Sequence, residues 1–339
     1  MFDDLKNIYM SDNLQAKYHG IELANKRAEI YSYDKNILDC HVSDFANFDF
    51  SGRFDYEDEN IKLQCLFINS CEPQKLYIVY NAARSTISLE EPNYFNRWSY
   101  YKIVDGCFLG IDDPMYLIYP KLLLGWFWGT KDVCYIDNTA RLIKKICDTK
   151  KIPLSECTFF SSSGGGFSSI LGAIAIPGSL SISINPQLYI QDWIYKEKFE
   201  DIVGVSLSAP DPLLRNNLAQ KIKNESKSKH IIIVNIQAIH DYEDVLKFAN
   251  EFGKKQIRYG LNLISEQVLI WVYDALPKVN GNAHTTFENK QIFKFIEYIA
   301  TEFRKNDDFD LDYYQNLVTI VNEIWREQSR MIREFSKQV

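Results

Sequence analysis

The chain has no excess of positive charge. Its 339 residues include 38 lysines and arginines against 45 aspartates and glutamates, which gives a formal net charge of −7. Proteins that bind nucleic acids or anionic lipid surfaces usually present a basic field to them. Nucleic acid is therefore not an expected partner.

Long apolar runs and a signal-peptide pattern are also missing. No stretch approaches the roughly eighteen apolar residues of a membrane span, and the opening segment 1–6 is acidic and amphipathic. The seven cysteines are odd in number, contain no C-x-x-C pair and mostly lie in apolar contexts typical of buried thiols. This cysteine pattern favours a reducing compartment, so we expect a cytoplasmic protein.

Apolar segments of strand length alternate with helical patterns over most of the chain. This alternation predicts an α/β fold with a mostly parallel sheet covered on both faces, in which active sites lie at the carboxyl ends of the strands. The expected strands are Leu76–Tyr80, Cys107–Ile111, Thr158–Ser162, Leu180–Ile184, Ile231–Ile236 and Val268–Tyr273. A segment before them, 51–68, is either the first hairpin of this sheet or part of a cap.

The same patterns divide the chain into three parts. We expect an N-terminal helical extension over residues 1–50, one catalytic domain over 51–305 and a C-terminal helix over 306–339. Residues 186–229 form a long, aromatic insertion between two strands, and insertions of this length often act as lids. The apolar stripe of the last helix favours packing against the core, with a homodimer contact as the alternative.

The segment Cys157–Phe167 has the pattern of a strand that turns sharply into a helix. In such G-x-S-x-G turns, small residues stand two positions before and after the nucleophilic serine, so that the turn can form and the hydroxyl stands clear. Ser161 and Gly165 flank Ser163 in this way. Choosing Ser162 would put Phe160 in a position that needs a small residue, so Ser163 is the predicted nucleophile.

Two other interpretations suit a segment rich in serine and glycine. It could be an ordinary surface loop, or it could cradle a phosphate, because N–H groups at the start of a helix bind anions. The segment lacks the Lys-Ser/Thr pair of a P-loop and the G-x-G-x-x-G spacing of dinucleotide-binding proteins. The phosphate interpretation is therefore the weaker one.

A nucleophilic serine needs a general base, and the chain has five histidines. His284 lies in a polar loop after the last expected strand, where the chain order serine, acid, histidine would deliver the base. His19 and His41 precede the sheet, and His230 opens a strand, where we expect a surface role. His240 is adjacent to the predicted acid, which makes it an awkward base.

The acid should follow the penultimate strand, because there it can orient the imidazole. Asp241 is the predicted acid, with Glu243 and Asp244 as alternatives. An acidic residue here also has an ordinary explanation, since acidic side chains are favourable in the first turn of a helix.

The remaining site residues would contact the oxyanion and the substrate. The N–H of Gly164, directly after the serine, is one expected oxyanion donor, and Ala82, after an early strand, is the second. Arg84 would either bind an anionic group of the substrate or lie on the surface. Aromatic rings could stack on sugars, although core packing is commoner, and the candidates are Trp126, Trp128 and Trp193.

With Ser161-x-Ser163-x-Gly165, Asp241 and His284, the chain resembles the serine-dependent α/β-hydrolase superfamily. Ser161 replaces the usual glycine, and an HGGG-type oxyanion segment is absent. Over about residues 60–300 the chain is also similar to proteins of bacterial capsule-polysaccharide gene clusters, in the motifs Phe95–Tyr100, Gly125–Thr130 and Ile184–Gln187. Relatives in such clusters include O-acetyltransferases.

This resemblance implies an enzyme that acetylates a surface or capsular polysaccharide, with acetyl-CoA as acyl donor and no bound cofactor or metal. An esterase that removes acetyl groups is the alternative, because the same triad serves both reactions. A protein of another class, a non-catalytic scaffold, would hold capsule-assembly machinery through its terminal helices. The ordered serine, acid and histidine argue against the scaffold, whereas peripheral association with that machinery suits an enzyme as well.

Overall fold

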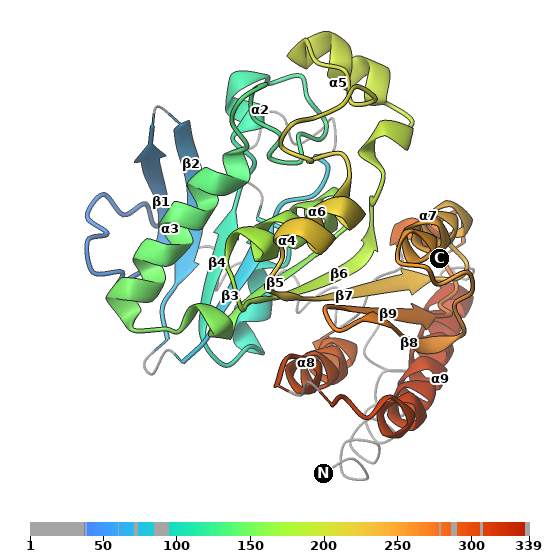
Figure 1. The fold of residues 1–339 in the computed structure, drawn as a ribbon. Coiled ribbons are helices and arrows are strands. Elements are labelled where there is room, and N and C mark those ends of the chain that lie inside the picture. The colour runs from blue at the N-terminus through green and yellow to red at the C-terminus, as the bar shows by residue number, and fades with distance from the viewer. Residues whose placement is uncertain are drawn as a thin grey trace.

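The computed structural model describes residues 37–335, except 38, 60, 71–73, 85–94, 278, 286–289 and 306–307. Most of the predicted N-terminal helical extension, and with it His19, lies outside the described residues. The predicted α/β architecture is confirmed: a mostly parallel sheet forms the centre of the molecule and helices cover both of its faces (Figure 1).

The described residues form one nine-stranded sheet with the order β1-β2-β4-β3-β5-β6-β7-β9-β8. Strands from β4 to β9 in this order pair in parallel, whereas β1, β2 and β8 pair antiparallel at the two edges. The bounds are β1 Ser51–Asp58, β2 Ile61–Ile68, β3 Leu76–Tyr80, β4 Cys107–Ile111, β5 Cys157–Ser162, β6 Leu180–Pro186, β7 Lys229–Asn235, β8 Gly260–Ser265 and β9 Val268–Tyr273.

All six expected strands are present, and the segment 51–68 is the first hairpin of the sheet rather than part of a cap. Strand β8 was not predicted. Its sequence, GLNLIS, is short and contains glycine and asparagine, which are uncommon in strands.

Helices lie on both faces of the sheet, and Figure 1 shows α3 and α4 across one face and α8 and α9 on the other. The helices are α2 Met115–Ile118, α3 Tyr135–Lys150, α4 Ser163–Ala175, α5 Lys196–Val203, α6 Leu218–Glu225, α7 Ile239–Glu251, α8 Lys290–Lys305 and α9 Leu311–Phe335. Short 3₁₀ turns are η2 Trp98–Lys102, η3 Leu154–Glu156, η4 Ile190–Asp192 and η5 Ala283–Thr285.

Continuous apolar strands follow from this two-sided cover. In β7, Ile231 and Ile233 join the core under α8 and α9, whereas Ile232 and Val234 join the core under α3, α4 and α7. All four side chains are at most 1% exposed. Burying each of them contributes on the order of 2 kcal/mol, so the central strands are the most strongly anchored part of the sheet.

The apolar stripe of α9 packs against the sheet. Val318 and Val321 are fully buried, and the Trp325 ring stacks on that of Tyr273 with 3.7 Å between centroids. This contact agrees with the expectation that the stripe faces the core. Within the part of the chain that the structure describes, no helix is both long and apolar enough to cross a membrane.

Candidate active site

The turn between β5 and α4 presents Ser163 at the carboxyl edge of the sheet. Ser162 has extended backbone angles, and Ser163 follows with φ 54°, in the left-handed region that non-glycine residues rarely adopt. Such strain is typical of a nucleophile held at the tip of a strand–helix turn. The predicted elbow is therefore present.

Two glycines after the serine let other chain segments approach it closely. A Cβ atom on Gly164 would lie 2.5 Å from Leu124 Cδ1, and one on Gly165 would lie 2.6 Å from the Tyr80 carbonyl oxygen. No real side chain could occupy either position without displacing its neighbour. The loop after β3 and the segment around Leu124 can thus both pack against the elbow.

Ser161 explains how this chain manages without the usual glycine before the nucleophile. The Ser161 hydroxyl accepts a hydrogen bond from the Tyr80 N–H at 3.0 Å and lies 2.9 Å from the Tyr80 carbonyl oxygen. The paired register of β3 and β5 ends at Ile78 and Phe159. The serine side chain therefore replaces backbone pairing where the two strands separate.

The structure brings the three predicted triad residues into one hydrogen-bond chain. His284 Nε2 lies 2.8 Å from Ser163 Oγ, and His284 Nδ1 lies 2.6 Å from Asp241 Oδ2. Ser163 is 9% exposed, so the residue is largely buried but still accessible to solvent. In this arrangement the imidazole can accept the serine proton while the carboxylate stabilises the imidazolium.

The acid comes from the first turn of α7, directly after β7. Asp241 is the carboxylate that reaches His284, and the alternatives Glu243 and Asp244 do not occupy that position. His240 has a fully exposed side chain and lies 3.9 Å from Glu243. Burial, together with the nearby Asp192 carboxylate, raises the pKa of Asp244 to about 6.

Of the two predicted oxyanion donors, Gly164 directly follows the nucleophile, and Ala82 follows Asn81, whose carbonyl oxygen would lie 3.2 Å from a Cβ on Gly165. Gly164 is in the first turn of α4, where backbone N–H groups have no partner within the helix and carry partial positive charge. Among the described residues, the Ala82 N–H makes no hydrogen bond, whereas its carbonyl accepts one from the Tyr116 hydroxyl at 3.2 Å.

Arg84 requires a correction. Its guanidinium pairs with the buried carboxylate of Asp112 and lies 4.1 Å from the centroid of the Tyr116 ring. Asn81 donates a further hydrogen bond to Asp112 at 2.8 Å. Arg84 is therefore not a free surface residue; its ion pair with Asp112 anchors the loop that carries Ala82.

Trp126 and Trp128 also require a correction, because they are only 1% and 3% exposed and offer no ring face to a sugar. Trp126 donates to Gln187 Oε1 at 2.8 Å, and the Arg215 guanidinium lies 4.1 Å from the centroid of Trp128. Trp193 is half-buried and packs edge-on against Trp126 at 4.9 Å. Of the three predicted rings, Trp193 alone has exposed surface.

His230 is the third correction. We expected a surface residue, but its side chain is fully buried between Ser181 and Ser226. Burial lowers the pKa of His230 from 6.5 to about 3, so the imidazole is neutral. The sequence shows an alternating serine pattern in β6, yet nothing local to His230 indicates that its partners come from neighbouring segments.

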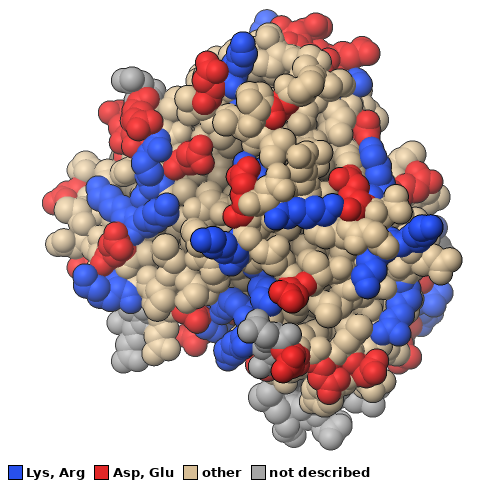
Figure 2. Space-filling view, in the orientation of Figure 1, with Lys and Arg blue, Asp and Glu red and all other residues tan. Residues whose placement is uncertain are grey.

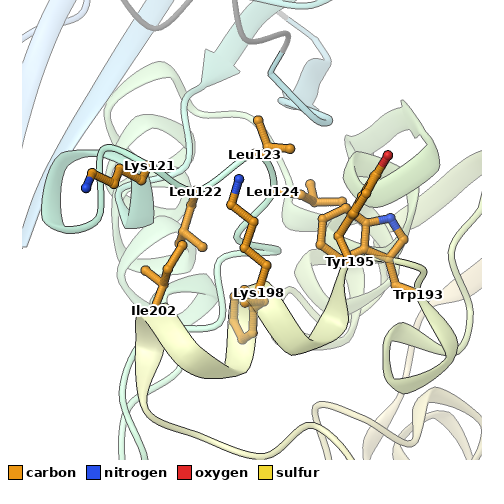
Figure 3. Close-up of a pocket in the computed structure, with 9 residues that line it drawn as sticks. Lys121, Leu122, Leu123, Leu124, Trp193, Tyr195, Lys198 and Ile202 are labelled. Carbon is orange, nitrogen blue, oxygen red and sulfur yellow. The ribbon is translucent and has the colours of Figure 1, made fainter.

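A shallow hollow lies next to the elbow, between residues 121–124 and α5 (Figure 3). It is open to solvent, with a cavity volume of only about 10 Å³, and Leu124, which packs on Gly164, forms part of its wall. The other lining residues are Lys121, Leu122, Leu123, Trp193, Tyr195, Lys198, Phe199 and Ile202. Apolar, aromatic and cationic groups therefore line a hollow that shares Leu124 with the surroundings of Gly164.

The surface around this region has no dominant charge. Figure 2 shows lysines and arginines interspersed with aspartates and glutamates over the face drawn. Long-range attraction of a highly charged partner to this face would accordingly be weak.

Comparisons with known proteins return structures only. No protein-family model and no curated protein sequence matches the chain. The capsule O-acetyltransferase of Neisseria meningitidis serogroup A is similar at 17% identity over 74% of this chain and 97% of that one, with a TM-score of 0.49. A mutant of that enzyme in complex with CoA gives 17% identity over 76% and 98%, with a TM-score of 0.48.

Acetyl xylan esterase 1 of Thermoanaerobacterium is similar at 13% identity over 66% of this chain and 77% of that one, with a TM-score of 0.45. Because these identities are below 20% and the TM-scores below 0.5, both the fold and the chemistry have to be argued from the structure itself. The chain has the α/β-hydrolase fold. Its serine, aspartate and histidine follow one another along the chain in the order of that fold's catalytic triad, and hydrogen bonds join the serine to the histidine and the histidine to the aspartate.

Proposed function

We propose that this protein is a cytoplasmic O-acetyltransferase that moves an acetyl group from acetyl-CoA to a hydroxyl of a surface or capsular polysaccharide. The observation that carries the proposal is the continuous hydrogen-bond chain from Ser163 through His284 to Asp241. The choice of donor and acceptor rests on the sequence resemblance to proteins of capsule-polysaccharide gene clusters.

In the first half-reaction, Ser163 Oγ attacks the thioester carbonyl while His284 Nε2 takes the hydroxyl proton. The N–H groups of Gly164 and Ala82 stabilise the oxyanion of the tetrahedral intermediate. When this intermediate collapses, the bond from carbon to sulfur breaks and His284 returns the proton to the departing thiol of CoA. The product is acetyl-Ser163.

In the second half-reaction, a sugar hydroxyl gives its proton to His284 and attacks the acetyl-Ser163 carbonyl. Collapse of the second intermediate breaks the bond to Ser163 Oγ, which recovers the proton from His284. Asp241 stabilises the imidazolium in both halves. With water in place of the sugar, the same steps hydrolyse an ester.

A transferase must keep water away from the acyl-enzyme until the acceptor arrives. The candidate shield is the segment 186–229, whose helix α5 lies beyond the sheet (Figure 1) and borders the hollow beside the elbow. Trp193 and Tyr195 supply ring surface there, and Lys198 supplies a cation. These groups suit a sugar chain or the polar tail of an acyl donor.

The test is incubation with acetyl-CoA and a panel of capsule polymers, followed by mass spectrometry of the glycan and of the protein. We expect acetyl mass on the glycan, CoA release that the polymer accelerates, and no transfer by Ser163→Ala. Removal of acetyl groups from acetylated glycan, without any use of acetyl-CoA, would establish the esterase instead.

Trimming the exposed tip of the shield sharpens this test. Ile194 is 81% exposed at that tip, next to Trp193. Replacing residues 193–195 by Gly-Ser-Gly should raise the ratio of acetyl-CoA hydrolysis to transfer, because water reaches acetyl-Ser163 sooner. An unchanged ratio would exclude the segment as the shield.

A further inference from the structure

Strand β6 ends in an asparagine that reaches the loop carrying the base. Asn185 is fully buried and has φ 43°, a left-handed conformation that asparagine tolerates better than most residues. Its Nδ2 donates to the His284 carbonyl oxygen at 3.0 Å, and its Oδ1 accepts from the Asn235 N–H at 2.8 Å. One amide thus links β6, β7 and the His284 backbone.

Asn235, at the end of β7, binds both ends of the same loop. Its Oδ1 accepts from the Ala275 N–H at 3.1 Å, and its Nδ2 donates to the Ala275 carbonyl at 2.8 Å and to that of Ala283 at 3.3 Å. The loop runs from the end of β9 to His284 and contains Pro277, which restricts the backbone, and Gly281, which permits many conformations. The two buried amides therefore fix where it begins and ends.

The residues after Asn185 contact the nucleophile. Pro186 forms an isolated bridge with Ser163, and the Gln187 N–H donates to the Ser163 carbonyl at 3.2 Å. The short segment 185–187 accordingly touches the backbone of the serine and that of the histidine. It therefore connects the backbones of the two residues by a route separate from their side-chain contact.

We propose that Asn185 and Asn235 are positioning residues that hold His284 within hydrogen-bond distance of Ser163. This inference rests on the triad of the proposed function but not on the identity of the acyl donor or acceptor. A displacement of about 1 Å between reacting groups can slow a reaction about a hundredfold. The loss of one amide, which leaves a second in place, should slow it about tenfold.

The experiment measures how fast a fluorophosphonate probe labels Ser163, because this reaction needs the activated serine and no knowledge of the substrate. Asn185→Asp keeps the Oδ1 acceptor for Asn235 and loses the Nδ2 donor to His284. Asn185→Gly removes the whole amide at a backbone angle that glycine adopts freely. Hydrolysis of p-nitrophenyl acetate supplies kcat and KM for the same variants.

Asn322→Asp is the matched control. Asn322 is also fully buried; its Oδ1 accepts from Trp271 Nε1 at 2.8 Å and its Nδ2 donates to the Val272 carbonyl at 3.0 Å. It packs on the same sheet from α9, away from the elbow. The substitution therefore reports the general cost of changing a buried amide, as a fall in melting temperature without slower labelling.

We expect labelling and kcat to fall about tenfold or more in both Asn185 variants, with KM little changed. If neither variant folds, Asn235→Asp applies the same test from β7, because it keeps the acceptor for Ala275 and loses both donated bonds. Labelling at the wild-type rate in the folded variants, or an equal loss in Asn322→Asp, would overturn the inference. A wild-type protein that does not label would overturn the triad as well.

Discussion

Among the described residues, two histidines contact serines, at opposite ends of the parallel strands. At the carboxyl edge, His284 lies between Ser163 and the Asp241 carboxylate, and its side chain is 23% exposed. At the amino edge, His230 lies between the hydroxyls of Ser181 and Ser226 and is fully buried. Among the residues that the structure describes, His284 has a carboxylate partner and His230 has none.

The difference shows what a base needs besides a serine. A buried imidazole between two hydroxyls stays neutral, because burial removes the water that would stabilise its protonated form, and the pKa of His230 accordingly falls to about 3. Ser181 is part of a regular strand, whereas Ser163 is in a strained backbone conformation. The His230 site therefore stabilises the fold, and the His284 site can perform chemistry.

The largest effect is expected at the two serines that contact these histidines. Ser163→Ala should lower kcat at least about a thousandfold with little loss of stability, because the hydroxyl performs the attack. Ser181→Ala should leave kcat unchanged and lower the melting temperature. Steady-state kinetics and thermal unfolding of both variants measure the contrast, and retained activity in Ser163→Ala with loss in Ser162→Ala would reassign the nucleophile.

Asp241→Asn would make the catalytic site resemble the buried one, with a serine and a histidine but no carboxylate. We expect kcat to fall at least about a hundredfold, since the imidazolium loses its stabilising charge. Asp244→Asn is the control and should stay within about threefold of wild type. A larger loss in the control than in Asp241→Asn would transfer the acid role to Asp244.

The buried His230 should make the stability of the protein sensitive to acid. The pKa of His230 is about 3 in the folded protein against 6.5 ordinarily, so its contribution to stability is complete above about pH 6.5 and is lost as pH falls toward 3. At pH 4.5 the free energy of unfolding lost through His230 amounts to about 2 to 3 kcal/mol. Urea unfolding at pH 7.5 and 4.5 should show a smaller loss in His230→Gln than in wild type.

His240→Gln supplies the control for that measurement, because the His240 side chain is fully exposed. It should lose as much stability between the two pH values as wild type does. Identical losses in all three proteins would show that His230 does not resist protonation.

The smallest effect concerns Asp244. Because burial raises its pKa to about 6, the folded protein favours the protonated carboxyl; the contribution to stability is complete below about pH 3.8 and is lost as pH rises through 6. Asp244→Asn, neutral at every pH, should melt on the order of one degree higher than wild type at pH 8 and no higher at pH 4. Glu243→Gln, which changes an exposed carboxylate on the same helix, should show no such dependence.

Much of the fold was predictable because both faces of the sheet are covered. A strand buried on both faces needs apolar residues at successive positions, and the six central strands could be predicted from these continuous apolar runs. The positions of Asp241 and His284 followed from chain order after the last two strands. Strand β8 has no such run, because it lies at the edge and is anchored by contacts with α9.

The errors concern side chains whose partners are distant in sequence. Arg84 is paired by Asp112 from the neighbouring strand end, and His230 is enclosed by serines from two other segments. Trp126 lies in a loop, where aromatic residues in the core and in a binding site have the same local pattern. The sequence does carry a signal for Asn185, because an asparagine directly before a proline at the end of a strand indicates an unusual backbone conformation without any knowledge of distant partners.

Ser161 has a consequence for how relatives of this chain can be found. A search pattern that admits only glycine two residues before the nucleophile passes over this sequence, although its elbow is intact. The position tolerates serine because the hydroxyl satisfies both backbone groups of Tyr80 where β3 and β5 diverge. A pattern that accepts serine at this position, and also requires an apolar strand upstream that corresponds to β3, would find sequences in which a serine takes the place of that glycine.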